Sequence, residues 1–214
     1  LAVDNTYMGP IWQHPLELGA DLSIYSATKY IGGHSDLIAG AVCANKEFIH
    51  RIKVQRTFLG NMLSPFTAWL MLRSLETLTV RMERAAYNAI QVNEFLKSHP
   101  KVEKTYFLGN LKESDPEFEV FKKQYKSTGA MIAFDIKGGE KEAFSVLNKL
   151  KMIKLAVSLG GTESLAEHPK TMTHSSIPKN LADKMQISDR LIRLSVGIEH
   201  YEDIINDIKQ ALED

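Results

Sequence analysis

Residues 21–40 read DLSIYSATKYIGGHSDLIAG, with a single lysine, Lys29, between a Ser-Ala-Thr step and a Gly-Gly-His turn. Leu22–Tyr25 alternates apolar and polar residues as the end of a β-strand does, and Gly32 and Gly33 then allow backbone geometries closed to other residues. Lys29 lies between them, so its amine is held at a fixed point. Such an amine suits Schiff-base formation with a carbonyl compound, while neighbouring hydroxyls take up an attached phosphate. The alternative is a surface lysine in a turn.

A second polar residue ends an apolar run upstream. Leu1–Val3 leads into Asp4, and this pattern places the carboxylate at the C-terminal edge of a parallel sheet, where open α/β folds bind ligands. Pyridoxal phosphate needs such a carboxylate, because an acid beside the ring nitrogen keeps that nitrogen protonated and lets the ring act as an electron sink. Asp4 and Ser-Ala-Thr-Lys together therefore indicate a pyridoxal-phosphate site.

The sequence resembles the Cys/Met-metabolism pyridoxal-phosphate enzymes, which include cystathionine γ-synthase, cystathionine γ-lyase, methionine γ-lyase and the O-acylhomoserine sulfhydrylases. The matching blocks are VDNTYMGP, SATKYIGGHSD, SLGGTESLAEHP, MTHSS and RLSVGIE, in the family's order and over essentially the whole chain. The resemblance implies an α/β, aspartate-aminotransferase-like fold (fold type I) that binds pyridoxal 5'-phosphate. It also implies a homo-oligomer, expected to be a tetramer, acting on a small amino-acid substrate.

The same resemblance assigns the cofactor residues. Lys29 is expected to bind the cofactor covalently and, once released by substrate, to move protons along the substrate's carbon chain. Asp4 is expected to pair with the ring nitrogen. Ser26 and Thr28 are expected to offer hydroxyls to the phosphate; turn capping, common for serine and threonine, is the alternative for these two.

Two further residues are assigned to the substrate. Arg193 lies in an otherwise apolar strand, Leu191–Ser195, where a guanidinium is costly unless it meets an anion, and its fork matches a carboxylate bidentately. The resemblance implies that Arg193 binds the substrate's α-carboxylate and that Ser158 helps to hold that carboxylate and the lysine. The alternative for the arginine is a structural ion pair with Glu163, Glu199 or Glu202.

The reaction expected from the family is elimination or replacement at the β or γ carbon of a sulfur amino acid or activated homoserine. Val157 stands where cystathionine-handling members commonly carry a glutamate, so the apolar residue favours a methionine γ-lyase type of substrate without a distal charge. Cystathionine γ-synthase and cystathionine γ-lyase remain the runner-up. A non-catalytic assembly or regulatory fragment is the alternative of another class, because several of the family's phosphate-binding and ring-stacking groups are missing from the sequence.

Composition excludes other classes. Lys+Arg and Asp+Glu both number 26, so no basic field for nucleic acid is expected. No apolar run approaches the ~20 residues needed to span a bilayer. The single cysteine, Cys43, fits a reducing cytosol, and the histidines His34, His168 and His174 match no zinc spacing, so no metal is expected. The opening on Leu1 inside a strand pattern, without a methionine, predicts the second part of a longer protein.

We expect three regions: residues 1–77 as the C-terminal part of the large cofactor domain, 78–97 as a connecting helix, and 98–214 as a small α+β domain.

Helices are expected within 10–19, at 47–55, in two stretches within 65–99 broken near 77–79, and at 140–150 and 202–212. Strands are expected at 38–45, 102–107, 131–136, 153–159 and 191–196. Residues 57–62, 111–126 and 160–176 are expected to be loops, the second with some helix, and the third is long enough to be functional. An apolar stripe is predicted to pack in the core: Ala68, Leu72, Leu75, Met82, Ala86, Ala89, Val92 and Leu96.

Overall fold

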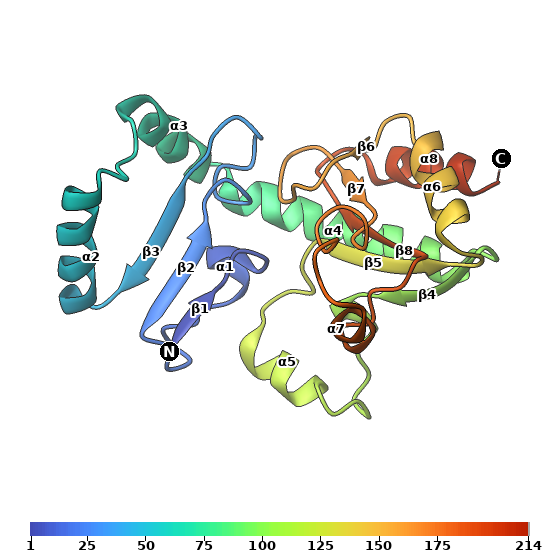
Figure 1. Ribbon diagram of the computed structural model, residues 1–214, viewed down its shortest axis with the longest axis horizontal. Helices are drawn as coiled ribbons and strands as arrows, with labels where there is room; N and C mark the ends of the chain where they lie inside the picture. Colours follow the sequence, from blue (N-terminus) through green and yellow to red (C-terminus); the bar gives the residue numbers. More distant parts are fainter. Residues whose placement is uncertain (214) are drawn as a thin grey trace. The chain divides into compact units, whose positions relative to one another are not determined.

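The computed structural model describes residues 1–213, which form two compact units (Figure 1). Unit 1 contains residues 1–82 and 112–127, and unit 2 contains residues 83–111 and the chain from 128 onward. Unit 1 comprises β1 (Ala2–Asp4), α1 (Gly9–Trp12), β2 (Leu22–Ser26), β3 (Gly40–Ala44), α2 (Lys46–Leu59), α3 (Pro65–Leu75), the start of α4 (Leu78–Ser98) and α5 (Phe118–Gln124). Unit 2 comprises the rest of α4, β4 (Val102–Tyr106), the 3-10 turn η1 (Leu108–Asn110), β5 (Met131–Ile136), α6 (Glu140–Lys149), β6 (Lys154–Leu155), β7 (Leu165–Glu167), α7 (Lys179–Lys184), β8 (Leu191–Ser195) and α8 (Tyr201–Glu213).

The sheet of unit 1 has the order β1-β2-β3. β1 and β2 are parallel, with Asp4 opposite Ile24, and β2 and β3 are antiparallel. Parallel pairing brings the carboxyl ends of β1 and β2 to one edge of the sheet. Asp4 and Ser26 end these two strands, so the fold places them at that edge, as the sequence predicts.

Helix boundaries in unit 1 follow from local capping. Ser64 caps α3, where its Oγ accepts the Thr67 N–H at 3.1 Å and Pro65 occupies the first helical position. Asn45 caps α2, and Gly60 ends it in the left-handed conformation at φ 75°. α2 therefore continues to Leu59, so the prediction of a loop from residue 57 is wrong for its first three residues.

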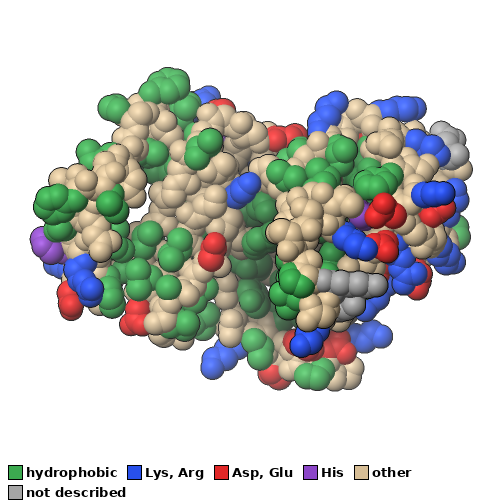
Figure 2. Space-filling model, viewed as in Figure 1, with side chains coloured by type: hydrophobic (Ala, Val, Ile, Leu, Met, Phe, Trp, Pro, Cys, Tyr) green, Lys and Arg blue, Asp and Glu red, His purple; other side chains and the backbone are tan. Residues whose placement is uncertain are grey.

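Large apolar side chains are exposed on α2, on α3 and on the loop between them. We call this set the α2–α3 apolar surface: Phe58, Leu59, Met62, Phe66, Trp69 and Leu72. Figure 2 shows hydrophobic side chains gathered over these two helices. The predicted apolar stripe is buried along α4, but its α3 members Leu72 and Leu75 are exposed, so the core prediction is wrong for these two.

The sheet of unit 2 has the order β4-β5-β8-β7-β6, with β6 and β7 parallel and the other neighbours antiparallel. Buried residues of α4 include Ala89, Val92 and Leu96, and the apolar face of α8 includes Ile204 and Ile208. β8, which carries Arg193, is a central strand of this sheet, and its position is set by pairing on both sides.

Two predictions fail between residues 153 and 184. The strand expected at 153–159 is only the two-residue β6, and the loop expected at 160–176 contains β7. α7 adds a short helix that was not expected. The Asp207 carboxylate of α8 accepts the backbone N–H groups of Lys151, Met152 and Ile153 at 2.8–2.9 Å, which fixes the turn just before β6.

Candidate active site

The chain winds into a tight turn directly after β2, and Lys29 lies in this turn. The Lys29 N–H donates to the Ser26 carbonyl at 3.0 Å, and the Gly33 N–H donates to the Lys29 carbonyl at 2.7 Å. A third bond, from the Gly32 N–H to the Ala27 carbonyl at 2.7 Å, closes the turn. The Lys29 backbone is thus fixed on both sides, while its side chain is half-buried.

Arg81 of α4 stabilises this turn through hydrogen bonds to its backbone carbonyls. Its buried guanidinium, 6% exposed, donates to the Tyr30 carbonyl at 2.8 Å and to the Ile31 carbonyl at 3.3 Å. It also donates to the Ser74 carbonyl at 2.8 Å and to Thr77 Oγ1 at 3.1 Å. Burial lowers the pKa of this guanidinium from its ordinary value. The two residues that follow Lys29 are therefore tied to α3 and α4 by one side chain.

Arg81 was not among the residues predicted from the sequence. A signal for it does exist: Arg81 falls three residues after Leu78 and four before Ala85, two residues of the buried face of α4. An arginine on an apolar helix face must find hydrogen-bond acceptors, and here these are backbone carbonyls.

Asp4 lies at the end of β1 with its side chain exposed, and its Oδ1 accepts the Thr6 N–H at 3.0 Å. Thr6 Oγ1 in turn accepts the Ser26 N–H at 2.7 Å, which links the ends of β1 and β2. The Thr28 hydroxyl donates to the Ala39 carbonyl at 3.3 Å and accepts the Ala39 N–H at 3.0 Å. Thr28 therefore already supports the chain before β3, and a phosphate contact from it would have to share this hydroxyl.

The predicted cofactor residues Asp4, Ser26, Thr28 and Lys29 thus belong to one end of the unit 1 sheet. Their chemistry fits pyridoxal phosphate: an amine for the aldehyde, hydroxyls for the phosphate and a carboxylate for the ring nitrogen. Within residues 1–213 no group of three or more His, Cys, Asp or Glu side chains is arranged to hold a metal ion. In the same described range, no helix has both the length and the apolar character needed to cross a bilayer.

The predicted substrate residues Ser158 and Arg193 belong to unit 2. Arg193 lies on β8 with its side chain 14% exposed, and its Nη1 is 2.9 Å from Glu167 Oε1. Its Nη2 donates to the Val157 carbonyl at 3.1 Å. Ser158, next in the chain, is half-buried in the loop after β6. Arg193 and the segment that carries Ser158 are therefore in direct contact.

The ion pair of Arg193 is formed with a residue that we did not expect. Glu199 instead accepts the Ser164 N–H at 2.6 Å and the Ser164 hydroxyl at 2.9 Å. Glu167 was missed because it lies in the predicted loop, where no strand pattern pointed to pairing with β8. In the structure it stands directly opposite Arg193 in the β7–β8 ladder.

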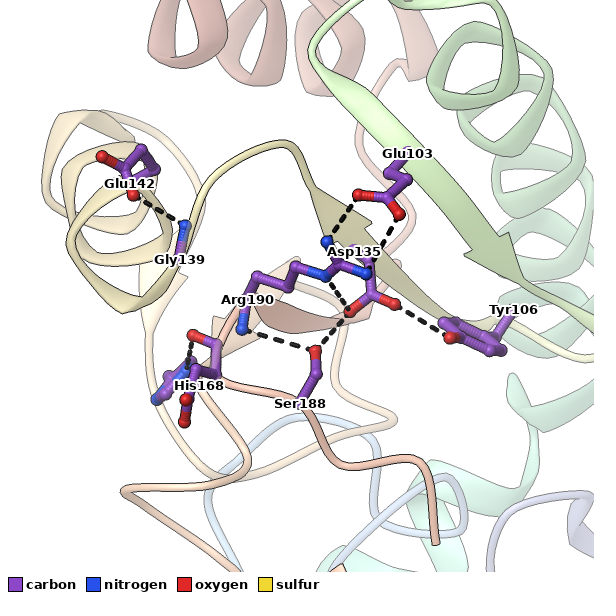
Figure 3. Close-up of polar contacts among 9 residues, drawn as sticks. Glu103, Tyr106, Asp135, Gly139, Glu142, His168, Ser188 and Arg190 are labelled. Carbon is purple, nitrogen blue, oxygen red and sulfur yellow. Dashed lines mark hydrogen bonds and ion pairs between the residues drawn. The ribbon is translucent and has the colours of Figure 1, made fainter. Parts of the chain in front are cut away.

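A polar network fixes the chain that leads into β8 (Figure 3). The buried Asp135 carboxylate of β5 accepts the Tyr106 hydroxyl at 2.8 Å and the Ser188 hydroxyl at 2.6 Å. Arg190 donates to both oxygens of Glu103, at 2.6 and 3.0 Å. Burial, together with the Asp135 carboxylate, raises the pKa of Tyr106 to about 12. The network anchors β8 three residues before Arg193.

Known proteins resemble this chain over nearly its whole length. A family profile described as Cys/Met metabolism PLP-dependent enzyme matches residues 1–213. The L-methionine gamma-lyase of Fusobacterium nucleatum subsp. polymorphum is 48% identical over 213 residues, which are 99% of this chain and 53% of that protein. The cystathionine gamma-lyase of Homo sapiens is 49% identical over 213 residues, which are 99% of this chain and 52% of that protein.

Solved structures show the same likeness. The crystal structure of cystathione gamma lyase from Micromonospora echinospora matches with a TM-score of 0.94 at 36% identity, covering 100% of this chain and 56% of that one. A cystathionine gamma synthase from Xanthomonas oryzae pv. oryzae matches with a TM-score of 0.92 at 41% identity, covering 99% of this chain and 54% of that one. The predicted α/β fold is confirmed, and the chain spans about half the length of the curated relatives it matches.

Proposed function

The chain belongs to the Cys/Met metabolism PLP-dependent enzymes, and we propose that its protein catalyses elimination or replacement on sulfur amino acids. The observation that carries the proposal is Lys29, held in its turn after β2 at the sheet end that Asp4 shares. When bound, pyridoxal phosphate would supply an electron sink for charge that develops on the substrate.

Each of the six predicted site residues has a distinct role in the proposed reaction. The Lys29 amine would hold the cofactor covalently and, once free, would accept and donate protons at its Nζ. Asp4 would pair with the ring nitrogen and keep it protonated, and the Ser26 and Thr28 hydroxyls would hold the phosphate. Arg193 binds the substrate's α-carboxylate, with Ser158 supporting that contact.

We further propose a methionine γ-lyase type of substrate. The supporting observation is Val157, whose exposed apolar side chain offers no charge to a distal ammonium group. The alternative is cystathionine γ-lyase or cystathionine γ-synthase. A methionine γ-lyase and a cystathionine γ-lyase have nearly equal sequence identity to this chain, 48% and 49%. Turnover of methionine compared with cystathionine by the purified protein separates the two lyase activities.

We also propose that the protein works as a homo-oligomer, a tetramer in the manner expected for the family, and in the cytoplasm. The α2–α3 apolar surface supports assembly, because large contiguous exposed apolar patches mark interaction sites. The single free cysteine, Cys43, suits a reducing compartment. The domain division at residues 77 and 97 stays a prediction.

The deciding experiment uses the complete protein that carries these residues. Wild-type protein mixed with pyridoxal phosphate is expected to develop an absorbance band near the visible edge, and borohydride is expected to fix the cofactor onto the peptide that contains Lys29. Lys29→Ala should fold and lose this adduct, because only the amine is removed. Lys46→Ala, which alters an exposed lysine at the start of α2, is the control and should keep it.

A non-catalytic assembly or regulatory protein is the competing function. It predicts that wild-type protein forms no borohydride-stable adduct at all. An adduct that persists in Lys29→Ala would instead assign the covalent role to another lysine.

A further inference from the structure

Glu167 is a buried carboxylate at the end of β7 in unit 2, and the catalytic roles proposed above make no use of it. Its side chain is 1% exposed and stands opposite Arg193 in the antiparallel β7–β8 ladder. Its Oε1 lies 2.9 Å from Arg193 Nη1 and accepts the Thr173 hydroxyl at 2.9 Å. Among the described residues, its Oε2 is buried without a hydrogen-bond partner.

The Arg193–Glu167 ion pair is asymmetric, because only one carboxylate oxygen contacts the guanidinium. A structural arginine–carboxylate pair optimised for stability commonly has two parallel hydrogen bonds, as Arg190 and Glu103 do here. Glu167 instead meets the guanidinium with one oxygen and leaves the other oxygen unbonded, at the cost of burying it. The contact fixes Nη1, and the Val157 carbonyl fixes Nη2.

Two neighbours extend this arrangement beyond the pair. Thr173 lies in the segment after β7, and because its hydroxyl donates to Glu167, its oxygen accepts the His174 Nδ1–H at 2.8 Å. Val157, whose carbonyl accepts from Arg193 Nη2, belongs to the segment that carries Ser158, before β7 in the sequence. The guanidinium plane is thereby held by acceptors from two different segments of unit 2.

We propose that Glu167 is a positioning residue that orients the Arg193 guanidinium for the substrate's carboxylate. This inference rests on the proposed function, because it requires Arg193 to bind that carboxylate. What Glu167 supplies is an acceptor oxygen at a fixed place, with Thr173 holding that oxygen. A residue of the same shape that keeps the acceptor, glutamine, should therefore replace it, whereas alanine should not.

The test uses the complete protein, loaded with its cofactor, and it has two readouts. The first is kcat and KM for the amino-acid substrate. The second is equilibrium binding of 2-methylalanine, which has a carboxylate and an amine but no α-hydrogen to be removed, followed by the cofactor's absorbance. Melting temperature is recorded on each preparation.

Glu167→Ala is expected to raise KM and to weaken 2-methylalanine binding by roughly 10- to 100-fold, since misplacing a binding group by about 1 Å can cost up to ~100-fold. kcat should change much less. Glu167→Gln should stay within about fivefold of wild type, because the amide oxygen still accepts from Nη1. Thr173→Val removes the hydroxyl that donates to Glu167 without leaving a cavity. It should change KM and 2-methylalanine binding in the same direction as Glu167→Ala, but by less. If Glu167→Ala does not fold, this variant still tests the proposal.

Glu202→Gln, an exposed carboxylate on α8, is the matched control and should behave as wild type. The inference is overturned if Glu167→Gln binds as weakly as Glu167→Ala, since charge rather than orientation would then matter. It is also overturned if the Glu167 and Thr173 variants lose only melting temperature. Failure of the proposed function looks different: Arg193→Ala itself would then leave 2-methylalanine binding unchanged.

Discussion

His168 illustrates at the scale of one residue how burial makes a side chain sensitive to pH. Its ring is fully buried against Phe144. Nε2 lies 2.9 Å from the Asp189 carbonyl, which can only accept, so Nε2–H donates and Nδ1 accepts the Thr171 hydroxyl at 2.9 Å. Burial lowers the pKa of His168 below its ordinary value of 6.5, and the nearby Glu140 carboxylate opposes this only in part.

The sign of the pH effect follows from this shift. Just below pH 6.5 the unfolded chain binds a proton at His168 that the folded chain does not, so the free energy of unfolding falls as pH drops from about 7. We expect His168→Gln, whose amide can keep both hydrogen bonds, to flatten this fall while lowering stability at pH 8 through poorer packing. Urea unfolding between pH 5 and 8 measures it.

The matched control for His168 is His50→Gln, because His50 is an exposed residue of α2. This variant should keep the wild-type pH dependence. Burial also lowers the pKa of His99, so part of the slope should survive in His168→Gln. A pH profile in His168→Gln identical to wild type would contradict the assignment.

Single residues also show what the sequence could and could not reveal about the site. The positions of Asp4 and Lys29 were predictable because Asp4 ends one strand pattern and Lys29 follows another within a few residues, and strand ends have a known place in an α/β fold. Arg81 and Glu167 were not, because their partners are defined only by folding: Arg81 bonds a carbonyl 51 residues away. The roles of Asp4, Ser26, Thr28, Lys29, Ser158 and Arg193 in binding stay predictions.

Turns are the elements on which the placement of Lys29 depends. Gly33 and Gly19 both adopt positive φ, at 67° and 98°. A Cβ on Gly33 would lie 1.8 Å from Arg81 Nη1, whereas a Cβ on Gly19 would meet nothing within 4 Å. The two glycines thus share backbone strain but differ in steric surroundings.

Gly19→Ala is expected to lower the free energy of unfolding by about 1–2 kcal/mol, the cost of a left-handed alanine. Gly33→Ala should cost on the order of 3–5 kcal/mol, because the methyl group also displaces Arg81 from the carbonyls it binds. Urea unfolding of the two variants compares them. Equal costs would mean that Arg81 moves aside freely and does not hold the turn.

The elements that were predictable have strong local signals. β5 matches its predicted bounds, and the Ser64-Pro65 start of α3 is a cap that can be seen in the sequence. β7 has only three residues, all buried, so it lacks the alternation that marks a strand; pairing with β6 and β8 makes it one. On α3, apolar periodicity was real but did not reveal that Leu72 and Leu75 would be exposed in this chain.

At the scale of the whole molecule, the two units are not continuous in sequence. Residues 112–127 belong to unit 1, where the Lys126 N–H donates to the Trp12 carbonyl at 2.8 Å and Gln13 Nε2 donates to Gln124 Oε1 at 3.3 Å. These residues are mostly charged or polar and carry no periodic signal that would assign them to unit 1. Contacts of such sequence separation become visible only in three dimensions.

The α2–α3 apolar surface allows the proposed assembly to be tested in the complete protein. Trp69 is 56% exposed in this chain, and a tryptophan at the centre of an interface typically contributes 2 kcal/mol or more to binding. Trp69→Glu would also place a carboxylate against apolar neighbours. We therefore expect it to weaken self-association by at least about 30-fold, at ~1.4 kcal/mol per factor of ten, as measured by light scattering across a dilution series.

Val120→Glu provides the control, because Val120 of α5 is similarly exposed, at 50%, and lies outside this surface. It should leave the molar mass unchanged at every concentration. A different result would assign the surface another role: if Trp69→Glu lowers the melting temperature but keeps the wild-type mass, the surface is covered within one polypeptide rather than between subunits. The mass and the melting temperature of the same two variants thus distinguish packing inside a chain from packing between chains.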